Sequence, residues 1–278
     1  MWLVTGADGQ LGSELKSLLG TSVIYVDRAE LDISDELAVK DFLEKNKFAG
    51  IINCAAYTGV DSAEAEPEKA DAVNHKGAKW LAKYGKCIVH ISTDYVFDGI
   101  HSRPYSETDQ PNPISSYGKS KLAGEQAVMD LAETALIIRT AWLYSGNGNN
   151  FLKTMLHLGL ERESVNVVCD QIGSPTYAGD LAQIIVEILP QIKRGQKTLY
   201  HFTNEGVCSW YDFAHAIMQI ADLSCHVNPI ESKDYSTKAI RPFYSVLNKQ
   251  KIKCDFNLEI RHWRDALNQV LREMKESK

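Results

Sequence analysis

The chain has 278 residues, of which 44% are hydrophobic and 24% charged, and its formal net charge is −6. This length allows one large domain or two unequal ones with an ample core, and the acidic balance argues against non-specific nucleic-acid binding, which needs cations to neutralise phosphates. No apolar stretch approaches the roughly 20 residues that cross a bilayer, so we expect neither a membrane nor a nucleic-acid partner.

The first half of the chain alternates short apolar runs with helical patterns, which is typical of βαβ units around a parallel sheet. Three prolines between residues 99 and 116 predict an exposed loop there. We expect strands at residues 1–4, 23–26, 50–53, 87–91 and 135–139, and helices at 11–19, 35–46, 67–84 and 116–131.

Beyond residue 142 the alternation is less regular. The overall expectation is an α/β fold with a Rossmann-like, doubly wound parallel sheet in residues 1–148, to which segments within 165–203 return. Residues 149–278 are expected to form mainly a smaller, partly interwoven C-terminal substrate-binding lobe. The elements expected in this half are helices at 151–160, 180–189, 209–221 and 262–274, and strands at 165–168 and 198–202.

The amino terminus and the cysteines favour a cytoplasmic protein. Residues 1–6 run directly into an apolar strand and lack the basic start of a signal peptide. The six cysteines are scattered, and no two have metal-ligand spacing, so we expect them to be reduced. The eight histidines form no ligand pattern either, and we expect no catalytic transition metal.

A glycine-rich turn joins the first strand to the first helix. Gly6, Gly9 and Gly12 have the spacing G-x-x-G-x-x-G. Gly6 would permit a tight turn, Gly9 would let the backbone approach a diphosphate, and Gly12 would let the helix pack closely on the sheet. The helix N-terminus would present N–H groups to the phosphates. A plain strand–helix connection is the alternative interpretation.

The end of the second strand bears on the choice of dinucleotide. Asp27 lies 15 positions after Gly12, where a carboxylate would hold an adenosine ribose. The adjacent Arg28 could instead receive a 2′-phosphate, so NADH and NADPH both remain open. Asp32 and Ile33 are expected beside the adenine, although Asp32 could instead cap the following helix.

Tyr117 and Lys121 lie one turn apart on the helix expected at 116–131. A phenol has an ordinary pKa near 10, and a nearby ammonium group with an oxidised nicotinamide ring would favour the phenolate. Such pairs also arise by chance. Thr93, however, follows a strand at the sheet edge where ligands bind, so we predict Thr93, Tyr117 and Lys121 as the catalytic group, with Lys121 also bonding the nicotinamide ribose.

Several segments together carry a family resemblance. The chain resembles the extended short-chain dehydrogenase/reductases, and among them most closely the dTDP-4-dehydrorhamnose reductase family. The string Ser-Thr-Asp-Tyr-Val-Phe-Asp-Gly at 92–99 is the most specific element. The other matching segments are 5–12, 53–61, 117–125, 139–144, 148–151, 170–176 and 241–242.

The resemblance implies a reaction. Hydride from NADPH or NADH reaches C4 of dTDP-4-dehydro-6-deoxy-L-mannose, Tyr117 donates the proton, and the product is dTDP-L-rhamnose. Thr93 tunes Tyr117, and Asp94 and Tyr95 line the sugar pocket. Trp142 covers the sugar, although it could instead be a core aromatic. The residues that the resemblance places at the cofactor are Gln10, Leu11, Ala55, Ala56, Tyr57 and Thr58.

The resemblance also implies a site for the substrate diphosphate and a site for Mg²⁺. In both cases the residues could instead be ordinary surface residues. Asn150, Lys153 and Arg241 would donate to the substrate diphosphate, or could simply be solvated. Some relatives bind Mg²⁺ at a homodimer contact through the glutamate matching Glu14, whereas an acid here could equally be favourable helix-N-terminal charge.

Other functions remain open. Another sugar-nucleotide 4-ketoreductase, an epimerase or a dehydratase could use the same scaffold. Dehydratases carry Thr-Asp-Glu where this chain has Thr93, Asp94 and Tyr95, which disfavours dehydration. A non-catalytic regulatory subunit resembling that of methionine adenosyltransferase is the alternative from another class.

Overall fold

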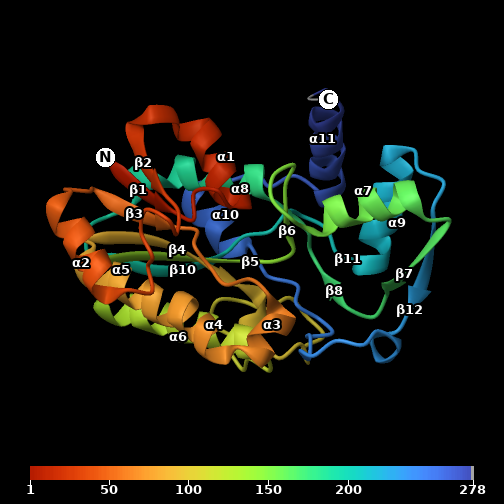
Figure 1. Ribbon diagram of the computed structural model, residues 1–278, viewed down its shortest axis with the longest axis horizontal. Helices are drawn as coiled ribbons and strands as arrows, with labels where there is room; N and C mark the ends of the chain where they lie inside the picture. Colours follow the sequence, from red (N-terminus) through yellow and green to blue (C-terminus); the bar gives the residue numbers. More distant parts are fainter. Residues whose placement is uncertain (277–278) are drawn as a thin grey trace.

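Six parallel strands form the central sheet of the computed structural model, which describes residues 1–276 (Figure 1). In sheet order they are β2 (Val23–Val26), β1 (Trp2–Thr5), β3 (Gly50–Asn53), β4 (Cys87–Thr93), β5 (Thr134–Thr140) and β10 (Lys197–His201). The order reverses between β1 and β3, and ligands of doubly wound sheets bind beyond the strand ends at such a reversal. The predicted Rossmann-like α/β class is confirmed.

Helices cover both faces of this sheet. Successive strand residues point to opposite faces, so Val4 and Ile52 pack against one helix layer and Leu3 and Ile51 against the other. Since both faces are buried, apolar residues predominate in the inner strands. One layer contains α1 (Gln10–Leu19), α8 (Ala178–Ile188) and α10 (Gln250–Phe256), and the other contains α2 (Glu36–Lys45), α5 (Ala78–Tyr84) and α6 (Ser116–Leu131).

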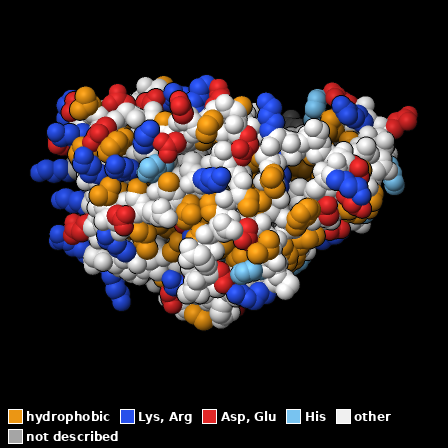
Figure 2. Space-filling model, turned by 90° about the horizontal axis from the view of Figure 1, so that it is seen from below, with side chains coloured by type: hydrophobic (Ala, Val, Ile, Leu, Met, Phe, Trp, Pro, Cys, Tyr) orange, Lys and Arg blue, Asp and Glu red, His pale blue; other side chains and the backbone are white. Residues whose placement is uncertain are grey.

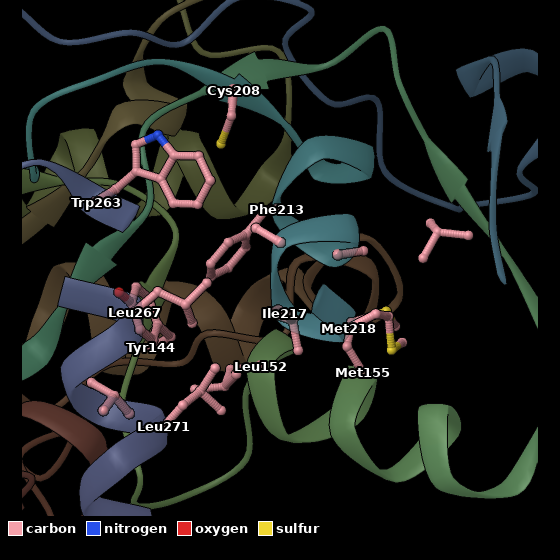
Figure 3. Close-up of a cluster of buried hydrophobic side chains, with 14 of the residues drawn as sticks. Tyr144, Leu152, Met155, Cys208, Phe213, Ile217, Met218, Trp263, Leu267 and Leu271 are labelled. Carbon is pink, nitrogen blue, oxygen red and sulfur yellow. The ribbon is translucent and has the colours of Figure 1, made fainter. Parts of the chain in front are cut away.

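A second, smaller lobe lies beside the sheet lobe (right in Figure 1). Its core is separate: Phe213 and Ile217 from one helix and Leu267 from another belong to the same buried cluster (Figure 3). The lobe contains α7 (Phe151–Glu161), α9 (Trp210–Ala221), α11 (Trp263–Glu276) and the parallel pair β7 (Ser164–Val168) and β12 (His226–Ile230).

Short strand pairs connect the two lobes. They are too short to show a two-residue period, and the sequence analysis missed all of them, together with β12, α10 and α3 (Val60–Ala65). The pairs are β6 (Leu143–Tyr144) with β9 (Thr176–Tyr177), and β8 (Ile172–Gly173) with β11 (Cys208–Ser209).

The expected elements are present with ends shifted by a few residues. The helix predicted at 116–131 matches α6 at both ends, and the strands predicted at 23–26 and 50–53 match β2 and β3. Of the segments within 165–203, α8 and β10 lie in the sheet lobe, whereas β7 lies in the C-terminal lobe. The expected lobe limit at residue 278 lies outside the described residues.

Two expectations need correction. The helix predicted at 67–84 is interrupted, because a π-helical turn (Ala72–Gly77) separates α4 (Pro67–Asp71) from α5. The loop between residues 99 and 116 does lack a helix, but it is not wholly exposed. Tyr105 is 1% exposed, and its ring stacks on Phe97 at 4.1 Å between centroids.

The surface is polar with scattered apolar side chains. On the face seen in Figure 2, lysine and arginine side chains gather at the sheet-lobe end, and hydrophobic side chains are spread over the middle. The most exposed large hydrophobic residues include Ile100, Ile240 and Phe243, all from loops. Within residues 1–276, no helix combines the length and apolar character needed to span a membrane.

Candidate active site

A cavity of about 610 Å³ opens beyond the carboxyl ends of β1, β3, β4 and β5. Its place at the reversal of strand order and its size are those of a ligand site. Of the residues predicted for the site, its wall includes Gly6, Gln10, Leu11, Gly12, Ala56, Thr58, Thr93, Asp94, Tyr95, Tyr117, Lys121, Trp142 and Arg241.

The glycine turn forms one wall. Gly6 has φ +66°, and a Cβ there would lie 2.7 Å from the Ala55 backbone, so the turn requires glycine. A Cβ on Gly12 would lie 2.6 Å from the Ala7 carbonyl oxygen, so the close approach that requires glycine here is to the turn itself. A Cβ on Gly9 would meet only the Gly6 carbonyl, at 3.2 Å, so the backbone here is open for a ligand.

Asn74 holds the loop that follows β3 against the cavity. It is buried in the π-helical turn, where its side chain accepts from the Tyr57 N–H (2.8 Å) and donates to the Tyr57 carbonyl and to Ser120 Oγ (both 3.0 Å). These bonds fix the position of Ala56 and Thr58. Sequence reasoning missed Asn74, and an asparagine inside a predicted helix is only a weak signal.

Thr93, Tyr117 and Lys121 meet in this cavity. Thr93 lies near enough to the Tyr117 phenol to affect its pKa, and the Thr93 hydroxyl donates to Asp94 Oδ1 at 3.1 Å. The Tyr117 ring contacts Tyr95 edge-on at 5.6 Å between centroids. Lys121 is buried, and its Nζ donates to the Ile91 carbonyl at 2.6 Å. The end of β4 and one face of α6 therefore supply the whole group.

Burial dominates the protonation of this group in the protein alone. Burial raises the pKa of Tyr117 to about 12, and the neighbouring Thr93 side chain opposes this rise while the Asp94 charge adds to it. Burial lowers the pKa of Lys121 to about 8, and the Glu125 carboxylate opposes this fall. Desolvation thus outweighs the predicted effect of Lys121 on the phenol, and both groups hold their protons at neutral pH.

A buried ion pair stands behind Lys121. Glu125 accepts from Arg139 Nε at 2.8 Å and Nη2 at 2.6 Å, and from Ser92 Oγ at 2.5 Å. Both charged side chains are at most 5% exposed. The pair ties α6 to β4 and β5 and so sets the position of Tyr117 relative to Thr93. Sequence reasoning gave these residues no site role, although Glu125 lies one turn beyond Lys121 on the same helix face.

Asp94, Tyr95 and Arg241 form the opposite side of the cavity. Burial raises the pKa of Asp94 to about 6 against hydrogen bonds from Ser245 and Thr93. Arg241 is hydrogen-bonded to Tyr95 and ion-paired with Asp61, with Nη2 and Oδ2 2.5 Å apart. Asp61 was not predicted, and it holds the guanidinium at the cavity wall.

Two stacked indoles complete the cavity. The rings of Trp142 and Trp210 are 3.6 Å apart between centroids and 9° from parallel, and both side chains line the wall. Trp142 is therefore at the cavity rather than only in the core. Trp210 is the first residue of α9. No motif or spacing in the sequence linked Trp210 to Trp142.

The residues predicted for the adenosine end lie outside this cavity wall, as far as the described residues show. Arg28 is 80% exposed and forms an ion pair with Asp32 at 3.2 Å. Ile33 belongs to the hydrophobic core. Asp35 accepts the N–H groups that cap α2, so the alternative capping role of Asp32 is wrong. The remaining residues predicted to bind the cofactor that lie outside the cavity wall are Gly9, Asp27, Ala55 and Tyr57.

The predicted diphosphate donors are only partly at the cavity. Asn150 caps α7 and donates to Gln10 Oε1 at 2.9 Å and to the Ser145 carbonyl at 2.8 Å, so its side chain is already engaged. The neighbouring Asn149 lines the cavity instead. Among the described residues the wall includes Arg241 but neither Asn150 nor Lys153.

Glu14 lies on α1, where Asn147 Nδ2 donates to it at 3.4 Å. Burial raises the pKa of Glu14, opposed by the Asn147 hydrogen bond and reinforced by the Glu273 charge. Within residues 1–276, no group of three or more histidine, cysteine, aspartate or glutamate side chains is arranged to hold a metal ion. The Mg²⁺ site therefore stays a prediction without support from this geometry.

Comparison with known proteins identifies the family. The RmlD substrate binding domain matches residues 1–276. A dTDP-4-dehydrorhamnose reductase from Aggregatibacter actinomycetemcomitans is 42% identical over 285 residues, covering 96% of this chain and 97% of the relative. The crystal structure of a Clostridium acetobutylicum dTDP-4-dehydrorhamnose reductase has a TM-score of 0.94 at 40% identity and covers 99% of both chains. That of a Bacillus anthracis dTDP-4-dehydrorhamnose reductase in complex with NADP has a TM-score of 0.93 at 38% identity and covers 98% of both. The chain therefore belongs to the RmlD substrate binding domain family, that of the dTDP-4-dehydrorhamnose reductases.

Proposed function

We propose that this protein reduces the C4 ketone of dTDP-4-dehydro-6-deoxy-L-mannose to dTDP-L-rhamnose with NADPH or NADH. The observation that carries this proposal is the single cavity that joins the glycine turn, the neighbouring Thr93 and Tyr117, and Trp142. Full-length relatives at about 40% identity that are named dTDP-4-dehydrorhamnose reductases support the choice of substrate.

The glycine turn suits a dinucleotide diphosphate. Gly9 caps α1 without a side chain, and uncharged residues form the first turn, so the free N–H groups and the helix dipole favour an anion. Asp27 would accept the adenosine ribose hydroxyls of NADH, and Arg28 would pair with the 2′-phosphate of NADPH. When bound, the reduced nicotinamide supplies the hydride to the ketone carbon.

The protein's own part in the reaction is to deliver a proton. Tyr117 holds its proton at neutral pH, as a general acid must, and donates it to the C4 oxygen of the sugar. The neighbouring Thr93 orients the phenol. The Lys121 ammonium stabilises the phenolate that remains and orients the nicotinamide ribose. Trp142 and Arg241 hold the sugar and its diphosphate.

We assign cofactor binding to the sheet lobe, residues 1–148 with α8 and β10, and substrate binding mainly to the C-terminal lobe. A cytoplasmic location remains a prediction. A homodimer with Mg²⁺ at Glu14 remains a prediction.

The test is the oxidation of NADPH and of NADH when dTDP-4-dehydro-6-deoxy-L-mannose is added, followed by absorbance at the reduced-nicotinamide band. We expect turnover with at least one cofactor, and the ratio of the two rates sets the preference. No turnover with either would overturn the proposal in favour of a regulatory subunit. An epimerase would purify with NAD⁺ bound, whereas a reductase should purify largely without cofactor, because it releases the oxidised form in each cycle.

A further inference from the structure

Trp142 has a backbone conformation that a bulky side chain rarely adopts. Its φ is +49°, in the left-handed region where Cβ crowds the following carbonyl oxygen. Such strain persists only where the surroundings hold it, and it gathers at functional sites. The Trp142 carbonyl accepts from the Thr176 N–H at 3.2 Å, which fixes the main chain but leaves the side chain to be held by other contacts.

Two contacts hold the indole of Trp142. The first is the nearly parallel stack on Trp210, at 3.6 Å. The second is the backbone of Gly173, where a Cβ would lie 2.6 Å from the indole, so only glycine leaves room for it. Trp142 follows β5 of the sheet lobe, while Trp210 begins α9 of the other lobe, so the stack joins side chains from both lobes at one cavity.

Trp210 is itself fixed in place. Ser209 and Asp212 form a reciprocal capping box at the start of α9, so the first residue of the helix has a set orientation. The ring of Trp210 also contacts Phe151, at 4.6 Å between centroids. A rigid ring behind Trp142 reduces the entropy that the cavity loses when a ligand settles against the indole.

We propose that Trp210 is a positioning residue that fixes Trp142 for the sugar ring of the substrate and thereby determines affinity for the sugar part rather than the nucleotide part. This inference rests on the proposed function, in which Trp142 covers the sugar. The ligand class is a hexose whose C–H bonds lie against an indole. Trp210 acts through Trp142 and is not itself a proton donor or a hydride acceptor.

The experiment separates the sugar from the nucleotide. Calorimetric titration of the full chain with dTDP-L-rhamnose and with dTDP gives the two dissociation constants for the wild type and for Trp210→Ala, Trp210→Leu and Trp210→Phe. Trp80→Ala is the matched control, because Trp80 is a partly buried tryptophan on α5 outside the cavity wall. Thermal unfolding of each variant shows which of them are folded.

We expect Trp210→Ala and Trp210→Leu to bind dTDP-L-rhamnose about tenfold more weakly, the size of effect that one aromatic stack allows. Their affinity for dTDP should stay within about twofold of wild type, and the KM for the keto sugar should rise while kcat changes little. Trp210→Phe keeps a flat ring and should restore most of the affinity. Leucine fills much of the space of the indole but has no flat ring, so Trp210→Leu tests the loss of stacking rather than the loss of side-chain volume. It also serves as the test if Trp210→Ala does not fold.

Circular dichroism gives a second, independent readout. Two stacked indoles couple their transitions, so the wild type should show an exciton couplet that Trp210→Ala and Trp142→Ala both lose. The couplet should persist when dTDP-L-rhamnose binds, and its disappearance on binding would overturn the proposal, because Trp142 would then have left Trp210.

Other results would also overturn it. Unchanged dTDP-L-rhamnose affinity in Trp210→Leu would show that the stack does not set the sugar site. Equal losses for dTDP and dTDP-L-rhamnose would show that Trp210 acts on the nucleotide or the fold. If the wild type binds neither compound, the proposed function itself fails, and this inference fails with it.

Discussion

Replacing Tyr117 by phenylalanine removes one hydroxyl group and little else. The ring remains to make the edge-on contact with Tyr95, 5.6 Å between centroids. Thr93 also keeps other partners, because its hydroxyl donates to Asp94 Oδ1 at 3.1 Å and accepts from the Tyr95 N–H at 3.2 Å. Thr93 therefore stays paired in the variant, and the unfolding free energy should fall by only about 1 kcal/mol, the net value of one hydrogen bond.

The effect on the reaction should be far larger. General acid catalysis contributes roughly 10²–10⁴ in rate, which corresponds to about 2.7–5.5 kcal/mol of barrier. We expect kcat of Tyr117→Phe to fall by that factor. The dissociation constant for NADPH should stay near the wild-type value, since the glycine turn and α1 are untouched.

Single-turnover stopped-flow with NADPH and the keto-sugar nucleotide measures the chemical step, and cofactor fluorescence titration measures binding. Thr93→Val is a useful comparison, because it removes the group that orients the phenol and should cause a smaller loss. A Tyr117→Phe enzyme with near-normal single-turnover rates would refute the assignment of Tyr117 as proton donor.

Three further predictions concern the turn, the lysine and the buried pair. Gly9→Val should abolish measurable NADPH binding in a titration while the chain still folds, since φ at Gly9 is −73°, which valine can adopt; normal binding would refute the diphosphate cradle. A lysine is charged below its pKa, and burial lowers the pKa of Lys121 to about 8, so kcat/KM should fall as pH rises through about 8. In Lys121→Met this fall near pH 8 should be absent, and cofactor binding should be impaired. A pH profile of Lys121→Met that equals the wild-type profile would contradict the role of the Lys121 charge. Glu125→Gln leaves the Arg139 charge buried without its counter-ion and should lower the unfolding free energy in a urea titration by about 3–5 kcal/mol. The double variant Glu125→Gln, Arg139→Gln should recover part of that loss, and a double variant no more stable than the single one would argue against the ion pair as the cause.

Much of the sheet lobe could be predicted from local patterns. Strands buried on both faces appear as short apolar runs, and helices such as α6 carry a regular period, so their existence and order follow from nearby residues. The glycine turn was recognisable for a similar reason, since its spacing falls between a strand and a helix. Where tertiary contacts set the structure, prediction failed, as with the π-helical turn that presents Asn74 to the loop after β3.

The protonation of the site shows the same division. The identity and spacing of Tyr117 and Lys121 indicated an acid–base pair, and the structure brings them together with Thr93. The direction of their pKa values could not be read from the chain, because burial by surrounding elements dominates both shifts. The sequence shows which charged groups lie near each other on a helix. It does not show how far the folded protein removes Tyr117 and Lys121 from water, and this desolvation dominates their pKa values.

By itself, the order of residues indicated the class of fold, the glycine turn and the side chains predicted to be catalytic, because each depends on neighbours within one strand, turn or helix. Only tertiary structure decided the partners that arrive from distant segments: Trp210 on Trp142, Asp61 on Arg241, and Arg139 on Glu125. These pairs span 14 to 180 positions in the chain. Their energies depend on burial and geometry, which exist only after the lobes have packed.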